Sequence, residues 1–217
     1  MNLAIFDLDN TLLSGDSDYL WGMFLVKKNL VDQQVYEERN QFFYDEYKKG
    51  RLNIFEFLQF SLKPLSEIEP KRLEELHAEF MQTEIIPIIT SKAKQLVEKH
   101  RQNGDYLLII TATNLFVTAP IASYFGMDHI IATNPEKIDG KYTGKVEGIP
   151  SFQEGKVKRF EKWLREQDFA VKESYFYSDS FNDLPLLKQV DRAIAVDPDE
   201  RLTAYANEKQ WEIISLR

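Results

Sequence analysis

Short apolar runs alternate with stretches of helical pattern along most of this chain, and this alternation limits its fold more than any other feature. Residues 90–103 and 114–125 have apolar side chains at helical spacing, and Gly104 and Gly126 follow them as helix ends. Strands that alternate with helices predict a doubly wound parallel sheet of the α/β class, with a Rossmann-like core. The predicted strands are residues 3–6, 106–111, 129–132, 174–177, 193–196 and 212–214.

Two segments depart from the alternation. Residues 14–88 contain no strand-like run, and aromatic residues recur there on helical faces, which predicts about four helices inserted after the first strand. The last of these is expected to begin near Pro70, since proline suits a first helical turn. The segment EKIDGKYTGKVEG, residues 136–148, places Asp139 and Gly140 between polar arms and predicts a small hairpin. The predicted division is an α/β core of residues 1–13 and 89–217 and a helical cap of residues 14–88.

The composition restricts the class of function. The chain has 217 residues, of which 43% are hydrophobic, so it can bury a sizeable core and suits one domain or one domain with an insertion. Its net charge of −8 would repel nucleic-acid phosphates and anionic membranes, which favours a small-molecule partner over both. It has no cysteine, and no apolar run approaches the about 20 residues of a membrane span. Because a short strand rather than a signal peptide begins the sequence, we expect a cytoplasmic protein.

The stretch LAIFDLDNTLL, residues 3–13, places two aspartates directly after the first predicted strand. Burying a carboxylate is costly unless it is paired, hydrogen-bonded or bound to a metal, so Asp7 and Asp9 need an explanation. They are either turn and helix-cap residues or ligands of a cation at the carboxyl edge of the sheet, where open α/β folds bind their ligands. This stretch alone leaves both explanations open.

Polar residues follow other predicted strands in the same way. Thr111 and Thr113 precede a predicted helix start, where backbone N–H groups favour an anion, although threonine is also an ordinary strand residue. Lys156 begins an amphipathic helix, where a solvated surface charge would be usual. Asp179 and Asp183 follow a strand of aromatic residues. A helix cap would account for one of these two acids but not for the whole set.

Together these residues resemble the motifs of the haloacid dehalogenase-like phosphatase superfamily over nearly the whole chain. The first motif, Asp-x-Asp-x-Thr, and the fourth, an acidic pair after a strand, are together and in this order highly specific for the superfamily. The second and third motifs are informative only in combination with them. The helical insertion and the segment DGKYTGKVEG look like the phosphoserine-phosphatase branch. The four motifs stand here as residues 7–11, Thr111, Lys156 with Lys158 as its alternative, and Asp179 with Asp183.

The resemblance implies a phosphatase that works through an aspartyl-phosphate with Mg²⁺ as its cofactor. Asp7 would attack phosphorus, and Asp9 would protonate the leaving alcohol and then deprotonate water. Mg²⁺ would be held by Asp7, the Asp9 carbonyl oxygen and Asp179, with Asp183 behind them. The implied catalytic residues are Asp7, Asp9, Thr111 and Lys156, and the implied metal residues are Asp7, Asp9, Asp179 and Asp183. The implied substrate-binding residues are Asp16, Thr111, Ala112, Lys156 and Asn182.

The residues that would select the substrate depart from the phosphoserine-phosphatase pattern. Those enzymes carry an arginine that clamps the substrate carboxylate, and residues 59–61, Gln-Phe-Ser, stand in its place here. Arg39 or Arg51 could replace this clamp. The glutamate that those enzymes have nine residues after the nucleophile is Asp16 in this chain. The missing arginine argues against a substrate with an α-carboxylate.

Asp16 and Asp18 stand beside Tyr19 and Trp21, a combination that suits an amine or another cation. The alternative is that SGDSD forms only a loop and a helix cap. Some relatives in this branch act on histidinol phosphate, which we rank first among substrates. Phosphoserine and a promiscuous range of small phosphorylated metabolites are the alternatives.

Two other classes of function share part of this pattern. Dehalogenases of the superfamily lack the second aspartate because they need no acid for an alkoxide, so Asp9 argues against them. A receiver-like signalling module would share the aspartate, threonine and lysine and accept a phosphoryl group, but it has no need of a large inserted cap. The sequence leaves the oligomeric state open.

Overall fold

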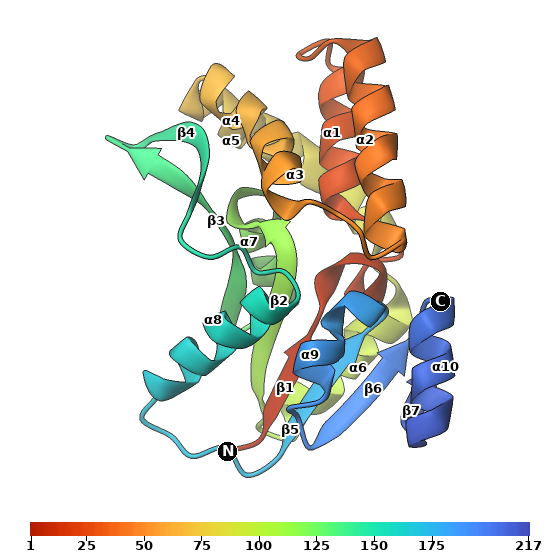
Figure 1. The fold of residues 1–217 in the computed structure, drawn as a ribbon. Coiled ribbons are helices and arrows are strands. Elements are labelled where there is room, and N and C mark those ends of the chain that lie inside the picture. Colours follow the sequence, from red (N-terminus) through yellow and green to blue (C-terminus); the bar gives the residue numbers. More distant parts are fainter.

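A seven-stranded sheet forms the centre of the molecule, which we describe over all residues 1–217 from a computed structural model. The strand order is β4-β3-β2-β1-β5-β6-β7, and every pair is parallel except β3 with β4 (Figure 1). The predicted doubly wound parallel sheet is therefore confirmed. The strands are β1 (Leu3–Phe6), β2 (Tyr106–Asn114), β3 (His129–Ile138), β4 (Lys141–Glu147), β5 (Ser174–Ser178), β6 (Arg192–Val196) and β7 (Glu212–Ile214).

Helices cover both faces of this sheet. They are α6 (Ser91–Gln102), α7 (Leu115–Phe125), α8 (Glu154–Arg165), α9 (Leu184–Leu187) and α10 (Glu200–Lys209). Leu3 and Ile5 of β1 belong to the buried cluster with α8, α9 and α10, whereas Ala4 and Phe6 belong to the cluster with α6 and α7. Because β1 is buried on both faces, all of its residues are apolar, which explains the unbroken run that the sequence shows.

The strand β3 continues six residues beyond its predicted end and turns back into β4. Its last part is mostly polar, so no apolar run marks it, and the pairing with β4 holds it in the sheet. Asp139 and Gly140 form the turn with φ angles of 50° and 79°, as the Asp-Gly pair predicts. A Cβ on Gly144 of β4 would lie 3.0 Å from Ser66 Oγ, so this hairpin packs closely against the inserted helices.

The inserted segment contains five helices rather than about four. The additional break falls at Leu62, because Pro64 has no N–H to continue the helix. The last helix begins at Pro70, as predicted. The helices are α1 (Ser17–Lys27), α2 (Gln33–Lys48), α3 (Ile54–Ser61), α4 (Lys63–Glu67) and α5 (Pro70–Phe80), followed by the turns Met81–Ile85 and Ile86–Ile88.

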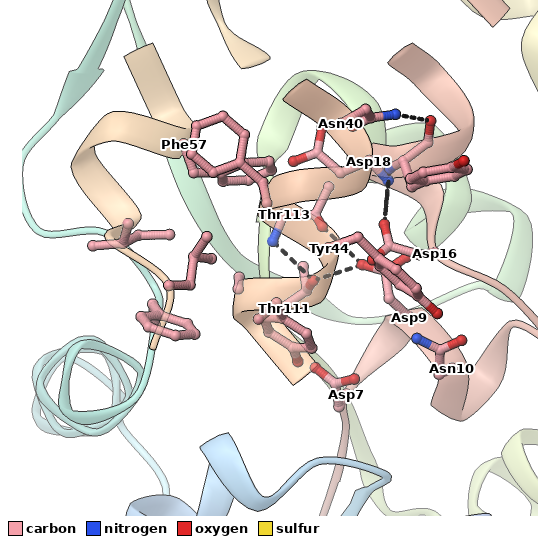
Figure 2. A pocket seen from close by; sticks show the side chains of 17 residues that line it. Asp7, Asp9, Asn10, Asp16, Asp18, Asn40, Tyr44, Phe57, Thr111 and Thr113 are labelled. Carbon is pink, nitrogen blue, oxygen red and sulfur yellow. Dashed lines mark hydrogen bonds between the residues drawn. The ribbon is translucent and has the colours of Figure 1, made fainter. Parts of the chain in front are cut away.

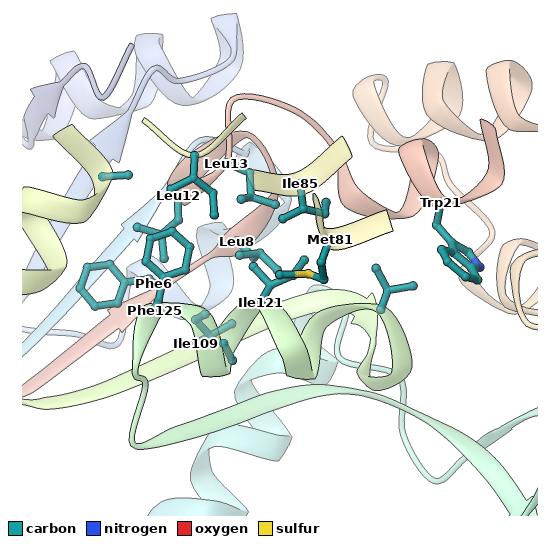
Figure 3. Close-up of a cluster of buried hydrophobic side chains, with 14 of the residues drawn as sticks. Phe6, Leu8, Leu12, Leu13, Trp21, Met81, Ile85, Ile109, Ile121 and Phe125 are labelled. Carbon is teal, nitrogen blue, oxygen red and sulfur yellow. The ribbon is translucent and has the colours of Figure 1, made fainter. Parts of the chain in front are cut away.

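These helices lie over the carboxyl ends of the strands (Figure 1). One cluster of 29 buried side chains joins them to the core, and Figure 3 shows Met81 beside Leu8 and Ile121, with Trp21 of α1 farther along the cluster. The chain enters and leaves the insertion at one point, where Leu13 pairs with Ile89. We keep the division into core and cap at these positions as a prediction. None of the helices combines the length and apolar character that crossing a membrane requires.

Candidate active site

The carboxyl edge of the sheet holds Asp7, the first residue after β1. Its N–H donates to the Tyr177 carbonyl oxygen of β5 at 2.9 Å, so the sheet itself fixes its backbone. Asp7 is only 5% exposed, and its Oδ1 accepts a hydrogen bond from Lys156 Nζ at 2.7 Å. The first aspartate of the motif is thus a buried acid with a cationic partner.

Lys156 lies buried between two carboxylates. Its Nζ is 2.7 Å from an oxygen of Asp7 and 2.7 Å from an oxygen of Asp183. The first turn of α8 fits tightly here, because a Cβ on Gly155 would overlap the Pro150 carbonyl oxygen. Lys158 is exposed on the same helix. The structure therefore brings Lys156, and not Lys158, to Asp7.

Thr11 joins the first motif to the fourth. Its hydroxyl oxygen lies 3.3 Å from Asp7 Oδ2 and 3.2 Å from Asp179 Oδ1, and it accepts the Asp179 N–H at 3.1 Å. Asp183 stands behind this group, where its Oδ2 accepts from the Ser178 hydroxyl at 2.7 Å. The four predicted metal residues therefore do not form one ring: Asp7 and Asp179 face each other across Thr11, and Asp183 binds Lys156.

Asp9 points toward the inserted helices rather than toward Lys156. Its Oδ1 accepts the Ser17 N–H at the start of α1 at 2.6 Å, and its Oδ2 accepts the Thr113 hydroxyl at 2.8 Å. Asn10 follows with φ of 56°, a left-handed conformation that asparagine tolerates. Burial raises the pKa of Asp9, which favours its protonated form.

The end of β2 supplies two hydroxyls to this side of the site. Thr111 Oγ1 lies 3.5 Å from Asp9 Oδ2 and accepts the Thr113 N–H at 3.2 Å. Thr113 makes the shorter contact with Asp9, although the sequence interpretation assigned no role to it. The sequence did contain a signal for Thr113: side chains alternate along a strand, so residues 111 and 113 lie on the same face. Ala112 lines the same pocket between them.

The acids of this edge outnumber the cations. Burial raises the pKa of Asp7 to about 7 against the opposing effect of Lys156, and burial with the charges of Asp7 and Asp183 raises the pKa of Asp179. No three His, Cys, Asp or Glu side chains form a ready-made metal cluster. Two carboxylates and the Asp9 carbonyl oxygen nevertheless suit Mg²⁺, which prefers oxygen ligands and keeps several waters. Burial and the neighbouring negative charges both raise these pKa values, and a cation here would offset both effects.

A pocket opens above these residues, between the sheet edge and the inserted helices (Figure 2). None of the residues that line it is a lysine or an arginine. The space open to water is about 60 Å³, well below the roughly 300–1,000 Å³ of most ligand sites. We therefore predict that the inserted helices move when a substrate enters. The lining residues are Asp7, Asp9, Asn10, Asp16, Asp18, Tyr19, Asn40, Phe43, Tyr44, Tyr47, Leu52, Ile54, Phe57, Thr111, Ala112, Thr113 and Phe152.

The remaining predicted residues are placed unevenly around this pocket. Asp16 and Asp18 line it, whereas Trp21 packs in the hydrophobic cluster with α5 and α7. Asn182 is buried but lies outside the lining, and its Nδ2 donates to the Tyr47 carbonyl oxygen of α2 at 3.2 Å. Tyr47 itself, which the sequence interpretation did not single out, lines the pocket close to the acids.

Neither of the two arginines that could replace the missing clamp reaches the pocket. The exposed Arg39 guanidinium stacks over the rings of Phe43 and Phe60, 4.9 Å and 5.8 Å from their centroids. Arg51 pairs with Glu46 at 2.8 Å, and its side chain is 64% exposed. The pocket therefore offers an acidic and aromatic surface without a cation for a substrate carboxylate.

Comparison with known proteins identifies the family. The sequence model of the haloacid dehalogenase-like hydrolases matches residues 4–188. The chain belongs to this family. It is 45% identical over its full length to a protein of Neisseria meningitidis serogroup C named histidinol-phosphatase, of which it covers 99%. It is 32% identical, over 99% of its length, to a phosphoserine phosphatase of Mycobacterium tuberculosis, of which it covers 70%.

Solved structures of this family agree with the architecture. A protein of unknown function from Bordetella pertussis Tohama I superimposes with a TM-score of 0.94 at 45% identity, with 100% of this chain and 99% of that chain covered. A substrate-bound phosphoserine phosphatase superimposes with a TM-score of 0.72 at 19% identity, with 100% of this chain and 93% of that chain covered. The chain is therefore a phosphatase of the phosphoserine-phosphatase-like branch, which favours hydrolysis over the receiver-like alternative.

Proposed function

We propose that this protein hydrolyses a small phosphomonoester through an aspartyl-phosphate on Asp7, with Mg²⁺ as cofactor and histidinol phosphate as substrate. The observation that carries the proposal is the arrangement around Asp7. Lys156 Nζ lies 2.7 Å from it on one side, while the Asp9 carboxyl group stands apart on the pocket side. Such a separation of a nucleophile from an acid and base is what two-step phosphoryl transfer requires. We expect it to act in the cytoplasm.

The first step transfers the phosphoryl group to the protein. An Asp7 carboxylate oxygen attacks phosphorus, the bond from phosphorus to the alcohol oxygen breaks, and Asp9 gives its proton to that oxygen. Lys156 favours the anionic form of Asp7 and, with the Thr111 hydroxyl, stabilises negative charge on the phosphoryl oxygens. The raised pKa of Asp9 suits it to hold the proton until this step.

The second step returns Asp7 to its starting form. A water attacks the phosphorus of the aspartyl-phosphate, Asp9 takes the proton from that water, and the bond to Asp7 breaks to release inorganic phosphate. Thr113 and the Ser17 N–H hold the Asp9 carboxyl in one orientation during both proton transfers. When bound by Asp7, Asp179 and the Asp9 carbonyl oxygen, Mg²⁺ supplies positive charge that orients and neutralises the transferred group.

The lining of the pocket favours a substrate without an α-carboxylate. Phosphoserine would bring its carboxylate into a pocket lined by Asp16 and Asp18, with no arginine or lysine in the lining to pair with it. That carboxylate would lose hydration and meet like charge. Histidinol phosphate, the substrate in the name of the Neisseria relative, carries an ammonium and an imidazole group instead.

A panel of substrates tests this function. We would compare kcat/KM for histidinol phosphate, phosphoserine, phosphoethanolamine, a sugar phosphate and 4-nitrophenyl phosphate, each with Mg²⁺ and with EDTA. Histidinol phosphate should be preferred, all activity should depend on Mg²⁺, and Asp7→Asn should abolish turnover. A preference for phosphoserine that is lost in Arg39→Ala or Arg51→Ala would contradict the substrate, and full activity in EDTA would contradict the cofactor.

A further inference from the structure

Asp18, in the first turn of α1, lines the pocket and has a buried carboxylate oxygen without a hydrogen-bond partner. The residue is 7% exposed, and no hydrogen-bond donor reaches its Oδ2. The single donor at its Oδ1 is Asn114 Nδ2, at the long distance of 3.5 Å. Burial, with the nearby charges of Asp16 and Asp9, raises the pKa of Asp18. An acceptor of this kind is costly to bury unless something else binds it.

The other acids on this side of the pocket are already held by the protein. Asp9 accepts hydrogen bonds from the Ser17 N–H and the Thr113 hydroxyl. Asp16 caps α1, where its Oδ1 accepts from the N–H groups of Asp18 and Tyr19 at 3.0 Å and 2.9 Å. Asp16 therefore serves the helix cap that the sequence allowed as an alternative. Asp18 is the acid whose acceptor capacity remains free.

The pocket supplies no cation that could bind Asp18, because its lining contains neither lysine nor arginine. Aromatic rings line the same space, among them Tyr44 and Phe57, which Figure 2 labels. Tyr19 and Phe43 belong to the same lining. Aromatic faces attract organic cations, and a buried carboxylate strengthens that attraction. A ligand that carries its own positive charge would fit this surface better than a neutral or anionic one.

We propose that Asp18 determines specificity by binding the protonated nitrogen of the substrate, an alkylammonium or imidazolium group, while the phosphoryl group lies at Asp7. This inference rests on the proposed function and assigns its selectivity to one side chain. The bound cation gives the buried carboxylate the partner that the fold does not provide, so only positively charged phosphates gain from it. A substrate carboxylate in the same place would be repelled.

The test is the selectivity of Asp18→Asn. The measured quantity is kcat/KM for histidinol phosphate divided by kcat/KM for 4-nitrophenyl phosphate, which carries no cation. Asparagine keeps the shape of the side chain but removes its charge, so the ratio should fall about 10- to 100-fold, as expected for loss of a charged hydrogen bond. Asp32→Asn is the matched control, because Asp32 is an exposed helix cap on α2 outside the pocket, and the ratio should not change.

Two analogues distinguish the sources of the cation. Phosphoethanolamine has the ammonium without the imidazole, and 2-(imidazol-4-yl)ethyl phosphate has the imidazole without the ammonium. A selectivity loss in Asp18→Asn with the first assigns the ammonium, and a loss with the second assigns the imidazolium. An unchanged ratio for histidinol phosphate in Asp18→Asn would overturn the inference.

A second measurement on the unsubstituted protein keeps the inference testable if Asp18→Asn does not fold. Histidinol should inhibit hydrolysis of 4-nitrophenyl phosphate at least about 10-fold more strongly than 2-phenylethanol, an uncharged alcohol of similar size. Equal inhibition would overturn the role of Asp18. Absence of any phosphatase activity would instead contradict the proposed function, so the two failures are distinguishable.

Discussion

Asp7→Asn should stabilise the metal-free protein although it abolishes turnover. Burial raises the pKa of Asp7 from its ordinary value of 3.8 to about 7. Because the unfolded chain has the lower pKa, this acid makes folding less favourable as the pH rises from about 4 to 7, and the effect is then constant. The difference of about 3 between the two pKa values corresponds to about 4 kcal/mol at pH 8, and to about 2 kcal/mol at pH 5.

Asparagine removes the charge and keeps an acceptor for Lys156, which retains Asp183 as its ionic partner. The free energy of unfolding in EDTA should therefore rise at pH 8 by up to about 4 kcal/mol, with a smaller rise at pH 5. Urea titrations of both proteins at the two pH values and constant ionic strength measure this. Adding Mg²⁺ should stabilise the unsubstituted protein more than the variant, since the cation compensates the charge of the buried Asp7 carboxylate.

Asp191→Asn is a control for which we expect the opposite change in the free energy of unfolding. The exposed Asp191 accepts hydrogen bonds from Ser174, chiefly its hydroxyl, which lower the pKa of Asp191, so this substitution should destabilise the protein slightly at both pH values. An Asp7→Asn protein that is less stable than the unsubstituted protein at pH 8 in EDTA would contradict a destabilising role of the buried Asp7 carboxylate. A stability difference that does not depend on pH would contradict it as well.

Three further outcomes follow from the site and the cap. Asp179→Ala should weaken Mg²⁺ activation by at least about 10- to 100-fold, and an unchanged magnesium titration would count against Asp179 as a ligand. Thr113→Val removes a hydroxyl whose hydrogen bond lowers the pKa of Asp9, so the pH profile of kcat should shift to higher pH. The shift should be larger than in Thr111→Val, because the Thr111 hydroxyl lies farther from Asp9. Identical profiles in the two variants would contradict the role given to Thr113. Oxidation of a Ser66→Cys, Gly144→Cys double variant should form a disulfide between α4 and the β4 hairpin, since a Cβ on Gly144 would lie 3.5 Å from the Cβ of Ser66. Turnover should fall on oxidation and recover on reduction. Turnover that oxidation leaves unchanged would argue against a moving cap.

The features that the sequence determined are those encoded by residues close together in the chain. The unbroken apolar run of β1 requires burial on both faces, and the motif of residues 7–11 follows it directly, so strand and candidate site were predictable together. Pro70 at the start of α5 and the Asp139-Gly140 turn were predictable for the same reason, because each acts through local backbone geometry.

The tertiary structure decided which side chains meet. The choice of Lys156 over Lys158 depends on the face of α8 that packs on the sheet, and the extension of β3 depends on pairing with β4. The free oxygen of Asp18 depends on burial and on the donors that the end of β2 brings to the other oxygen, since Asp16 and Asp18 look alike in sequence. Strand and turn patterns reflect steric effects between residues close together in the chain. The burial of a carboxylate and its hydrogen-bond partners depend on distant segments, so only the folded chain distinguishes Asp16 from Asp18.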